Sequence, residues 1–510
     1  MSARVIVVGG GPVGLTTALL LARQGVRVLV VERGEAAQRT TRAMQRRLPR
    51  TVSLDDESLR IWQACGIEDR ILGDWEGGEQ GAVMCRYLTP HGRTFLRLRQ
   101  AETDFGYPQA VVVHEGRITD VLAAAAARDG RITLREGCSV SALDQDAACV
   151  RVTVRDAGGA LSTESADWVV ACDGARSTVR GLLGIAMHGA TLETPWLVAN
   201  LADTEPVRHA AIRCDPRRSS VMVSIPHGVR RIECMLRPDE EARVKQGSEA
   251  VRAILASIWS EAASTPILSA SVVRFESRMA ERWRLGRVFL AGDAAHLSPP
   301  FAAQGLAAGL RDAANIACKL GGVLRGWLAP EDLASYEAER RPHQERLSRL
   351  ALRLGRIMAP RSIPEAVAVQ GAVRMLTALP FVDRLLHMRG RAIRPHYRAG
   401  FIGSGAAAGA FLPQPTIVLP HGGIRRLDDL LGSQLAWIAI GDGDRPGAGY
   451  AAPFAPDAPR LVENIDFRDP SRTLQRALGR GSRVLVRPDR IIHTHLQAAG
   501  RLPHLFGRTA

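Results

Sequence analysis

A chain of 510 residues is longer than one hydrophobic core usually supports and predicts about three domains. Its composition, 46% hydrophobic and 23% charged, excludes a disordered chain and is typical of a soluble globular protein. The net charge of +15 raises the question of nucleic acid, but the arginines that carry nearly all of it are spread along the chain. We therefore expect no nucleic-acid partner.

The eight cysteines never form a C-x-x-C pair, so neither a zinc ribbon nor a dithiol redox site is predicted. This use of cysteine favours a reducing, cytoplasmic location. Residues 5–22 carry no charge, yet the glycines and Pro12 would interrupt a helix there, so we expect no membrane span. The close pair His493 and His495 lacks further ligands nearby, and no metal site is predicted.

The N-terminal segment has the pattern of a dinucleotide-binding βαβ unit. Residues 4–8 form an apolar strand, and Gly9, Gly11 and Gly14 follow in G-x-G-x-x-G spacing before an apolar helix and a second strand. Gly9 permits the tight turn, Gly11 lets the backbone approach a pyrophosphate, and Gly14 lets the helix pack on the strand. Glu32 ends the second strand, where its carboxylate can accept hydrogen bonds from a ribose.

Further elements follow in chain order. We expect a helix at residues 55–64, glycine-punctuated strands as far as Tyr107, and an alanine-rich helix at 118–128. Strands are then predicted at 132–135, 150–154 and 168–172. Residues 196–237 alternate apolar and polar side chains over several short runs, which indicates an antiparallel sheet with one buried face. This second layer is expected to cover a ligand.

The C-terminal half begins with a buried strand, a proline loop and a long helix from about Leu306 to Trp327. Leucines and alanines at steps of three and four place an apolar stripe on its core side, and four polar residues fall on its other faces: Arg311, Asp312, Asn315 and Lys319. A second helix is predicted at 331–357. Beyond about Gly400, strand-like runs surround a short helix at 473–478 and indicate a small separate α/β domain.

Two further motifs follow predicted buried strands, namely DGARSTVR at 173–180 and GDAAH at 292–296. Together with the glycine motif, they resemble the three fingerprints of the single-component FAD-dependent aromatic hydroxylases, the p-hydroxybenzoate hydroxylase-like family. By this resemblance the glycine motif holds the ADP part of FAD, Asp293 bonds the ribityl chain, and Asp173 lies where FAD meets the nicotinamide donor. The helix that starts near Gly305 presents free N–H groups, which suit the negative charge of a reduced flavin.

The resemblance is closest to the 3-(3-hydroxyphenyl)propionate hydroxylase branch, on the stretches 48–62, 287–305, 310–320 and 336–343. It implies that Arg50 faces the flavin and that the Pro300 carbonyl lies beside the reacting ring. The full set of cofactor-binding residues is expected to be Gly9, Gly11, Gly14, Glu32, Arg33, Arg50, His114, Asp173, Gly292, Asp293, Pro300, Gly305 and Leu306. The other arginines of 39–50 either meet flavin phosphates or an anionic substrate, or belong to a solvated loop. The chain departs from the pattern at Ala302, Ala307 and His114.

The implied fold is α/β, a Rossmann-type FAD-binding domain with an inserted antiparallel-sheet substrate domain and a C-terminal thioredoxin-like domain. The FAD-binding domain is predicted at 1–75, 110–195 and 275–390, the substrate domain at 76–109 and 196–274, and the thioredoxin-like domain at 399–510. The last has no cysteine and so no dithiol chemistry. A structural or oligomer-forming role is expected for it, in a monomer or homodimer.

The implied activity is hydroxylation of a phenolic aromatic compound, such as a 3-(3-hydroxyphenyl)propionate-like acid, with NADH or NADPH and O2 through a flavin C4a-hydroperoxide. No residue is assigned as catalytic. Pro300, Ser224, His227 and Tyr107 are candidates near the reacting ring, and Arg213 is a candidate for a substrate carboxylate. Two alternatives stay open: a hydroxylase that tailors a polyketide or larger aromatic, and an FAD-binding protein without oxygenase activity.

Overall fold

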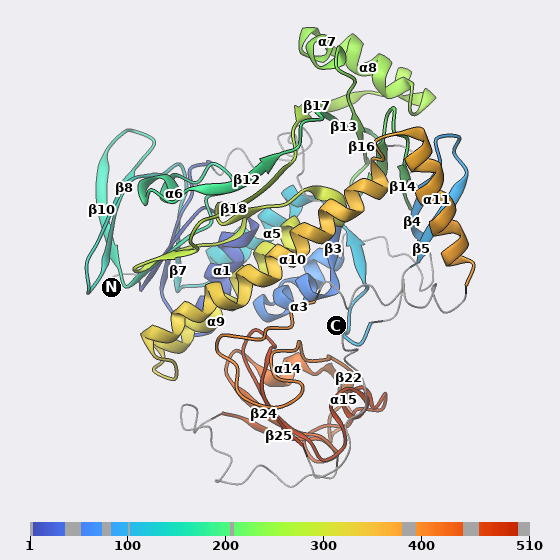
Figure 1. Ribbon diagram of the computed structural model, residues 1–510. Coiled ribbons are helices and arrows are strands. Elements are labelled where there is room, and N and C mark those ends of the chain that lie inside the picture. Colours follow the sequence, from blue (N-terminus) through green and yellow to red (C-terminus); the bar gives the residue numbers. More distant parts are fainter. Residues whose placement is uncertain are drawn as a thin grey trace.

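The computed structural model describes residues 4–35, 53–73, 83–99, 103–203, 209–379, 394–441 and 458–497 (Figure 1). Its largest core surrounds a six-stranded sheet of order β19-β20-β11-β1-β2-β7. The strands are β19 (Arg284–Leu285), β20 (Val288–Leu290), β11 (Trp168–Ala171), β1 (Val5–Val8), β2 (Val28–Val31) and β7 (Ile132–Arg135). All pair in parallel except β19 with β20. β1, β2 and β11 are buried throughout, as strands covered on both faces are.

Helices α1 (Pro12–Arg23), α5 (Glu115–Arg128) and α9 (Gly305–Leu324) pack on this sheet, with α1 in contact with both others. A three-stranded meander adds its valines to the same core; it consists of β8 (Ser139–Gln145), β9 (Val150–Arg155) and β10 (Leu161–Ala166). The dinucleotide-binding fold predicted from residues 4–32 is therefore present, and α5 and β7 lie where the sequence places them.

A seven-stranded sheet of order β17-β13-β16-β15-β14-β4-β5 forms the second layer. Its strands are β17 (Ile267–Val273), β13 (Trp196–Ala202), β16 (Val229–Met235), β15 (Ser220–Ile225), β14 (Ala210–Arg213), β4 (Val83–Leu88) and β5 (Thr94–Arg99). Only β14 and β4 pair in parallel. The expected antiparallel region at 196–237 is observed, and the segment before Tyr107 joins it.

The two faces of this sheet have different neighbours. Leu197, Ala199 and Leu201 of β13 pack with α8 (Ser248–Ala256), and we call this the outer face. Trp196 points to the other side, where its ring lies 6.1 Å from that of Phe301 in the loop before α9. We call that side the inner face, since it meets the dinucleotide-binding part of the molecule.

A long helix, α10 (Ser335–Met358), crosses the molecule between the two sheets in the view of Figure 1. A short 3-10 turn, η5 (Pro330–Ala334), precedes it, so the helix predicted at 331–357 is divided. The strands β12 (Met187–Thr191), β18 (Glu276–Ala280) and β21 (His296–Leu297) form a further sheet, and α11 (Ile363–Thr377) packs on β5. The sequence did not predict β12, β17, β18 or α11.

The C-terminal part has its own core around a four-stranded sheet of order β25-β24-β26-β27. Its strands are β24 (Ala436–Ala439), β25 (Arg460–Val462), β26 (Arg483–Val486) and β27 (Ile492–Leu496); α14 (Asp428–Leu431) precedes β24, and α15 (Thr473–Leu478) lies between β25 and β26. β24 and β25 are parallel, while β26 is antiparallel to both of its neighbours. A hairpin of β22 (Thr416–Val418) and β23 (Ile424–Arg426) precedes this sheet.

Four polar residues of α9 are buried, whereas a simple amphipathic helix exposes its polar residues to solvent. Arg311, Asp312, Asn315 and Lys319 lie off the apolar stripe, as the sequence places them, yet each is at most 3% exposed. Helices α3 (Asp56–Cys65) and α10 cover these faces. No helix within the described residues is long and apolar enough to cross a membrane.

Candidate active site

The glycine loop after β1 has the geometry that its spacing predicts. Gly9 has φ +106°, and a Cβ there would lie 2.4 Å from the Cys172 carbonyl oxygen. A Cβ on Gly14 would lie 2.0 Å from the Gly9 oxygen, so this glycine is required by helix–strand packing. A Cβ on Gly11 would meet no atom within 4 Å. Gly11 therefore borders open space at the start of α1, which is where a pyrophosphate would bind.

Glu32 is held beside this loop. Its Oε2 accepts a hydrogen bond from the Gly10 N–H at 2.5 Å, and its Oε1 accepts one from the Gly34 N–H at 2.6 Å. These bonds fix the carboxylate at the end of β2, within reach of a ribose on the glycine loop. Arg33 follows on the exposed side of this bend.

The DG motif forms a turn that starts α6 (Thr178–Leu182). The Asp173 carboxylate accepts hydrogen bonds from Ser177 Oγ at 2.5 Å and from the Val179 N–H at 3.1 Å. Arg180 donates to the carbonyl of Ala294 at 3.0 Å and to that of Ala175 at 2.9 Å. Arg180 thus ties this turn to the GD motif, a role that the sequence analysis did not assign.

The GD motif is held by hydrogen bonds to Asp312 of α9. Gly292 has φ +61° and donates its N–H to Asp312 Oδ2 at 2.9 Å. The same oxygen accepts a bond from His296 Nε2 at 2.7 Å, while Asp312 Oδ1 accepts one from Arg340 Nε at 2.8 Å. Burial opposes ionisation of Asp312, but His296 and Arg340 outweigh it and lower the pKa of its carboxyl. Asp293 is half-buried between buried neighbours, at the loop surface that the ligand would meet.

The proline loop leads to the N-terminus of α9. Pro300 begins a 3-10 turn and is exposed, and Ala303 has φ +52°. Gly305 opens the helix, and a Cβ there would meet no atom within 4 Å. The free N–H groups of this helix end therefore face open space beside Pro300 and the half-buried Leu306, as an anionic ring would require. The family pattern has a glycine where this chain has Ala302. In this structure the left-handed backbone conformation that favours glycine occurs one residue later, at Ala303.

Buried ion pairs hold the start of α9 against α3. Arg311 donates from Nε to Glu57 at 2.7 Å and from Nη2 to Asp55 at 2.5 Å, and its Nη1 bonds Gln304 at 2.8 Å. Asp55 also caps α3 through the Ser58 N–H. Asp55 and Glu57 are therefore connected directly, through Arg311, to the loop that leads into α9.

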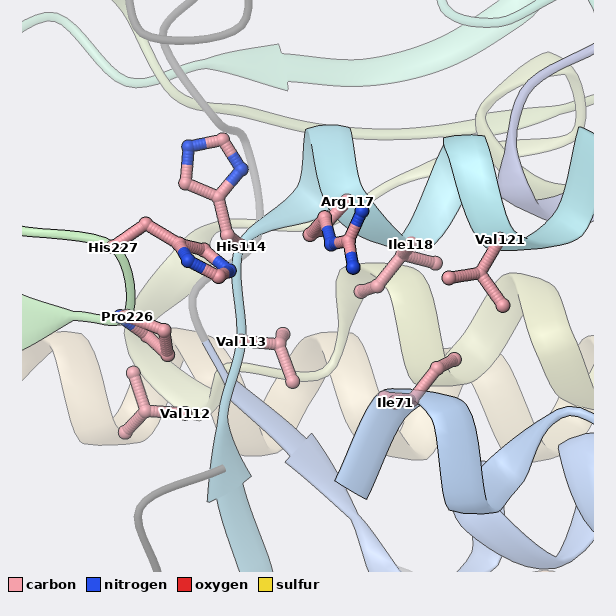
Figure 2. Close-up of a pocket in the computed structure, with 9 residues that line it drawn as sticks. All are labelled: Ile71, Val112, Val113, His114, Arg117, Ile118, Val121, Pro226 and His227. Carbon is pink, nitrogen blue, oxygen red and sulfur yellow. The ribbon is translucent and has the colours of Figure 1, made fainter. Parts of the chain in front are cut away.

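His114 and His227 line a small cleft between α5 and the turn joining β15 to β16 (Figure 2). Their ring centroids are 6.2 Å apart. His227 has φ +69° at the turn, and in Figure 2 its side chain reaches toward the start of α5, where Arg117 lies. His114 is 7% exposed, and burial together with the neighbouring His227 lowers its pKa. Both effects favour the neutral ring over the protonated one.

Two of the candidate residues near the substrate lie elsewhere, which corrects the sequence-based expectation. Ser224 pairs with Arg230, whose guanidinium lies 4.4 Å from the Trp259 ring on the outer face. Arg213 pairs with Ser220, and Ser220 pairs with Cys234 of the outer-face cluster. Since directly paired residues share a face, both side chains point away from the inner face.

Tyr107 is buried against the C-terminal part. The Arg426 guanidinium lies 4.3 Å from its ring centroid, and burial raises the pKa of its hydroxyl. These surroundings do not favour the phenolate that proton abstraction needs. The remaining predicted residue, Arg50, lies outside the described residues.

The site has open space beside Gly11 and Gly305, an acidic group at the end of β2, and loops joined by Arg180. These features fit a dinucleotide whose ring lies at the start of α9. This geometry defines the class as a dinucleotide-binding protein. Residues 2–351 match the family described as FAD binding domain, and the chain belongs to it. It is a flavin-dependent monooxygenase that binds FAD.

Known relatives agree with this assignment. A 3-(3-hydroxy-phenyl)propionate/3-hydroxycinnamic acid hydroxylase of Burkholderia vietnamiensis is 36% identical, over 86% of this chain and 78% of its own length. The solved OxyS anhydrotetracycline hydroxylase from Streptomyces rimosus is similar with a TM-score of 0.77 at 27% identity, covering 96% of this chain and 95% of that chain. Aklavinone-11 hydroxylase with FAD and aklavinone shares the fold with a TM-score of 0.76 at 22% identity, covering 98% and 96%.

Proposed function

We propose that this protein hydroxylates a phenolic aromatic acid of the 3-(3-hydroxyphenyl)propionate type, with NADH or NADPH and O2 as co-substrates. The observation that carries the proposal is the relative with 36% identity over 86% of this chain, whose name states that activity. The site geometry supports it, because the flavin-facing loops and the start of α9 are all present.

FAD supplies the chemistry of hydride acceptance and oxygen activation when it is bound. Gly9, Gly11 and Gly14 would shape the loop for its pyrophosphate, and Glu32 and Arg33 would lie at the ribose. Gly292 and Asp293 would border the ribityl chain, and Asp173 would lie where FAD meets the nicotinamide donor. Pro300, Gly305 and Leu306 present backbone groups to the ring, and Arg50 is assigned by resemblance alone. The N–H groups at the start of α9 stabilise negative charge on the ring.

The two histidines supply hydrogen-bonding groups at the edge of the sheet. Burial and the neighbouring His227 lower the pKa of His114, so its ring is neutral at pH 7 and is a poor base for a phenol. We assign to His227 the contact with the substrate side, since it extends from the sheet, and to His114 the contact with the flavin side.

The parts of the chain have separate roles in this proposal. Residues 1–75, 110–195 and 275–390 bind FAD, residues 76–109 and 196–274 cover the substrate, and residues 399–510 form a thioredoxin-like domain. The strand order β25-β24-β26-β27, with one parallel pair and an antiparallel hairpin, supports the last assignment. Without cysteine, this domain has a structural role, in a monomer or a homodimer.

The test is a panel of phenolic acids added to the FAD-loaded protein with NADH or NADPH. We expect a 3-hydroxyphenyl acid to accelerate flavin reduction and to be converted to a product with one more hydroxyl group. If no phenolic compound accelerates the reduction, the proposal is wrong.

A second candidate is a hydroxylase that tailors a polyketide or another larger aromatic. The similarity to OxyS over 96% of this chain favours it. The same panel separates the two, because a tailoring enzyme is expected to respond to a multi-ring phenol and not to a single-ring acid.

A further inference from the structure

The inner face of the seven-stranded sheet carries a polar cluster that the sequence analysis did not identify. Trp196, Val198 and Asn200 alternate onto this face of β13, and Trp196 contacts Phe301 beside the proline loop. At the other end of the face, Val223 and Ile225 of β15 pack with Val112 of β6 (Ala110–Val112). The positions between these two contacts therefore face the dinucleotide-binding part.

Asn200 lies between these contacts and is 1% exposed. Its Nδ2 donates a hydrogen bond to Ser269 Oγ at 3.1 Å, which fixes the amide. Its Oδ1 is buried and has no hydrogen-bond partner in the described structure. A buried acceptor without a donor is energetically unfavourable, so such a group is usually explained by a ligand or an ordered water.

Arg231 is the direct neighbour of Asn200 across the strand pair β13–β16. Side chains at directly opposed positions have Cβ atoms about 5 Å apart, so these two side chains start from neighbouring positions on the inner face. Arg231 is 6% exposed, and its Nε donates to Glu233 at 2.6 Å. Glu233 lies two residues along β16 on the same face, and its carboxylate neutralises the guanidinium.

We propose that Asn200 and Arg231 bind a hydroxyl group of the aromatic substrate. Asn200 Oδ1 accepts the hydrogen bond of the hydroxyl, and Arg231 donates one to its oxygen. A hydroxyl is the group that both donates and accepts, so it matches an acceptor and a donor placed side by side. This proposal rests on the proposed function, and it assigns recognition of the substrate's hydroxyl group to the inner face of the sheet.

The test measures equilibrium binding to the FAD-loaded protein through the change in flavin absorbance. The probes are 3-(3-hydroxyphenyl)propionate and 3-phenylpropionate, which differ by the one hydroxyl. The wild type is expected to bind the hydroxylated probe roughly 10-fold more tightly, because a site built for a hydroxyl is left with unpaired groups by the other probe. Asn200→Leu is expected to remove this preference and to leave binding of 3-phenylpropionate unchanged.

A double variant, Arg231→Met with Glu233→Met, removes the ion pair as a unit. It is also expected to lose the preference for the hydroxylated probe. This variant tests the proposal if Asn200→Leu does not fold. Ser224→Ala on the outer face is the matched control and should keep the full preference. A wild type without the preference, or variants of the inner face that retain it, would overturn the proposal. Because binding is measured without turnover, a protein that prefers the hydroxylated probe but forms no oxygenated product contradicts only the proposed function.

Discussion

Gly11 and Gly14 are both glycines of the same loop, yet they are required for different reasons. A Cβ on Gly14 would overlap the Gly9 carbonyl oxygen, whereas a Cβ on Gly11 would enter open space. Gly14→Ala is therefore expected to lower the free energy of unfolding by about 2 kcal/mol or more, whether or not FAD is present. Thermal and denaturant unfolding of the FAD-free protein measures this.

Gly11→Ala is expected to leave the FAD-free protein within about 1 kcal/mol of the wild type, because its backbone has φ −75° and its side chain meets nothing. Its affinity for FAD should fall by more than roughly 10-fold, since the methyl group occupies the approach of the pyrophosphate. Titration of FAD into both variants checks the difference. Normal FAD affinity in Gly11→Ala would place the dinucleotide elsewhere.

Ala303 has a backbone conformation that favours glycine, with φ +52°. Ala303→Gly is expected to raise the free energy of unfolding by about 0.5–1 kcal/mol, because the left-handed conformation costs alanine about 1–2 kcal/mol and glycine almost nothing. The matched control is Ala302→Gly in the preceding 3-10 turn, which should be destabilising. Equal effects of the two changes would contradict this account.

The residues found from sequence were those whose role is local. The spacing of Gly9, Gly11 and Gly14 determines their functions within one turn, so their geometry was predictable. Arg213 and Ser224 were misplaced because alternation along a strand identifies two faces but does not say which one meets the cofactor. Only the pairing with Ser220 and Arg230 settles that.

At the scale of elements, α9 connects the cofactor site to the C-terminal part. Its N-terminus lies at the proline loop, and its Lys319 donates to Glu339 of α10 at 2.7 Å. Arg487, which follows β26, donates to both oxygens of Glu339 at 2.9 Å. All three side chains are at most 2% exposed. The partners of Lys319 are distant in sequence, which is why its burial could not be predicted from the helix pattern.

Glu339→Gln is expected to lower the free energy of unfolding by about 3 kcal/mol, because it leaves two buried cations without their shared counter-charge. Glu345→Gln on the same helix is the matched control. Glu345 is largely exposed and lies 3.5 Å from Arg341, so its loss should change stability by less than about 0.5 kcal/mol. Denaturant unfolding of the three proteins measures the difference, and similar values for both variants would refute the role of Glu339.

The same carboxylate contributes to acid sensitivity. Burial opposes its ionisation, but Arg487 and Lys319 outweigh it and lower the pKa of Glu339 from 4.5 to about 2. A carboxyl with a lowered pKa in the folded state stabilises the protein above the pKa of the unfolded state, and this stabilisation is lost as pH falls from about 4.5 toward about 2. The difference in stability between wild type and Glu339→Gln should therefore shrink over that range.

At the scale of the whole molecule, the C-terminal part is joined to the rest by buried contacts. Arg60 of α3 forms a bidentate pair with Asp428 at 2.8 and 3.0 Å, and its guanidinium lies 4.5 Å from the Phe411 ring. Phe105, Tyr397, Phe411 and Ile491 form one apolar cluster across the boundary. The sequence predicted a separate α/β unit from its composition, and in the structure this unit has its own core and is joined to the FAD-binding part by buried contacts.

The three cofactor motifs were predictable, because each motif follows a buried strand and parallel strands end at one edge of a sheet. The inner-face pair of Asn200 and Arg231 was not, because it depends on the register between β13 and β16. Site residues on neighbouring strands can therefore be identified only from the structure, whereas a loop formed by one stretch of chain can be predicted from the sequence.

In the proposed reaction, the protein transfers one oxygen atom from O2 to a phenolic ring. The direct measurement is turnover of the FAD-loaded protein with NADH or NADPH, a 3-hydroxyphenyl acid and isotopically labelled O2, followed by mass spectrometry of the product. We predict a product that carries one labelled oxygen atom on the ring. Consumption of the nicotinamide donor that yields only hydrogen peroxide, with the aromatic acid recovered unchanged for every phenol tested, would contradict the account.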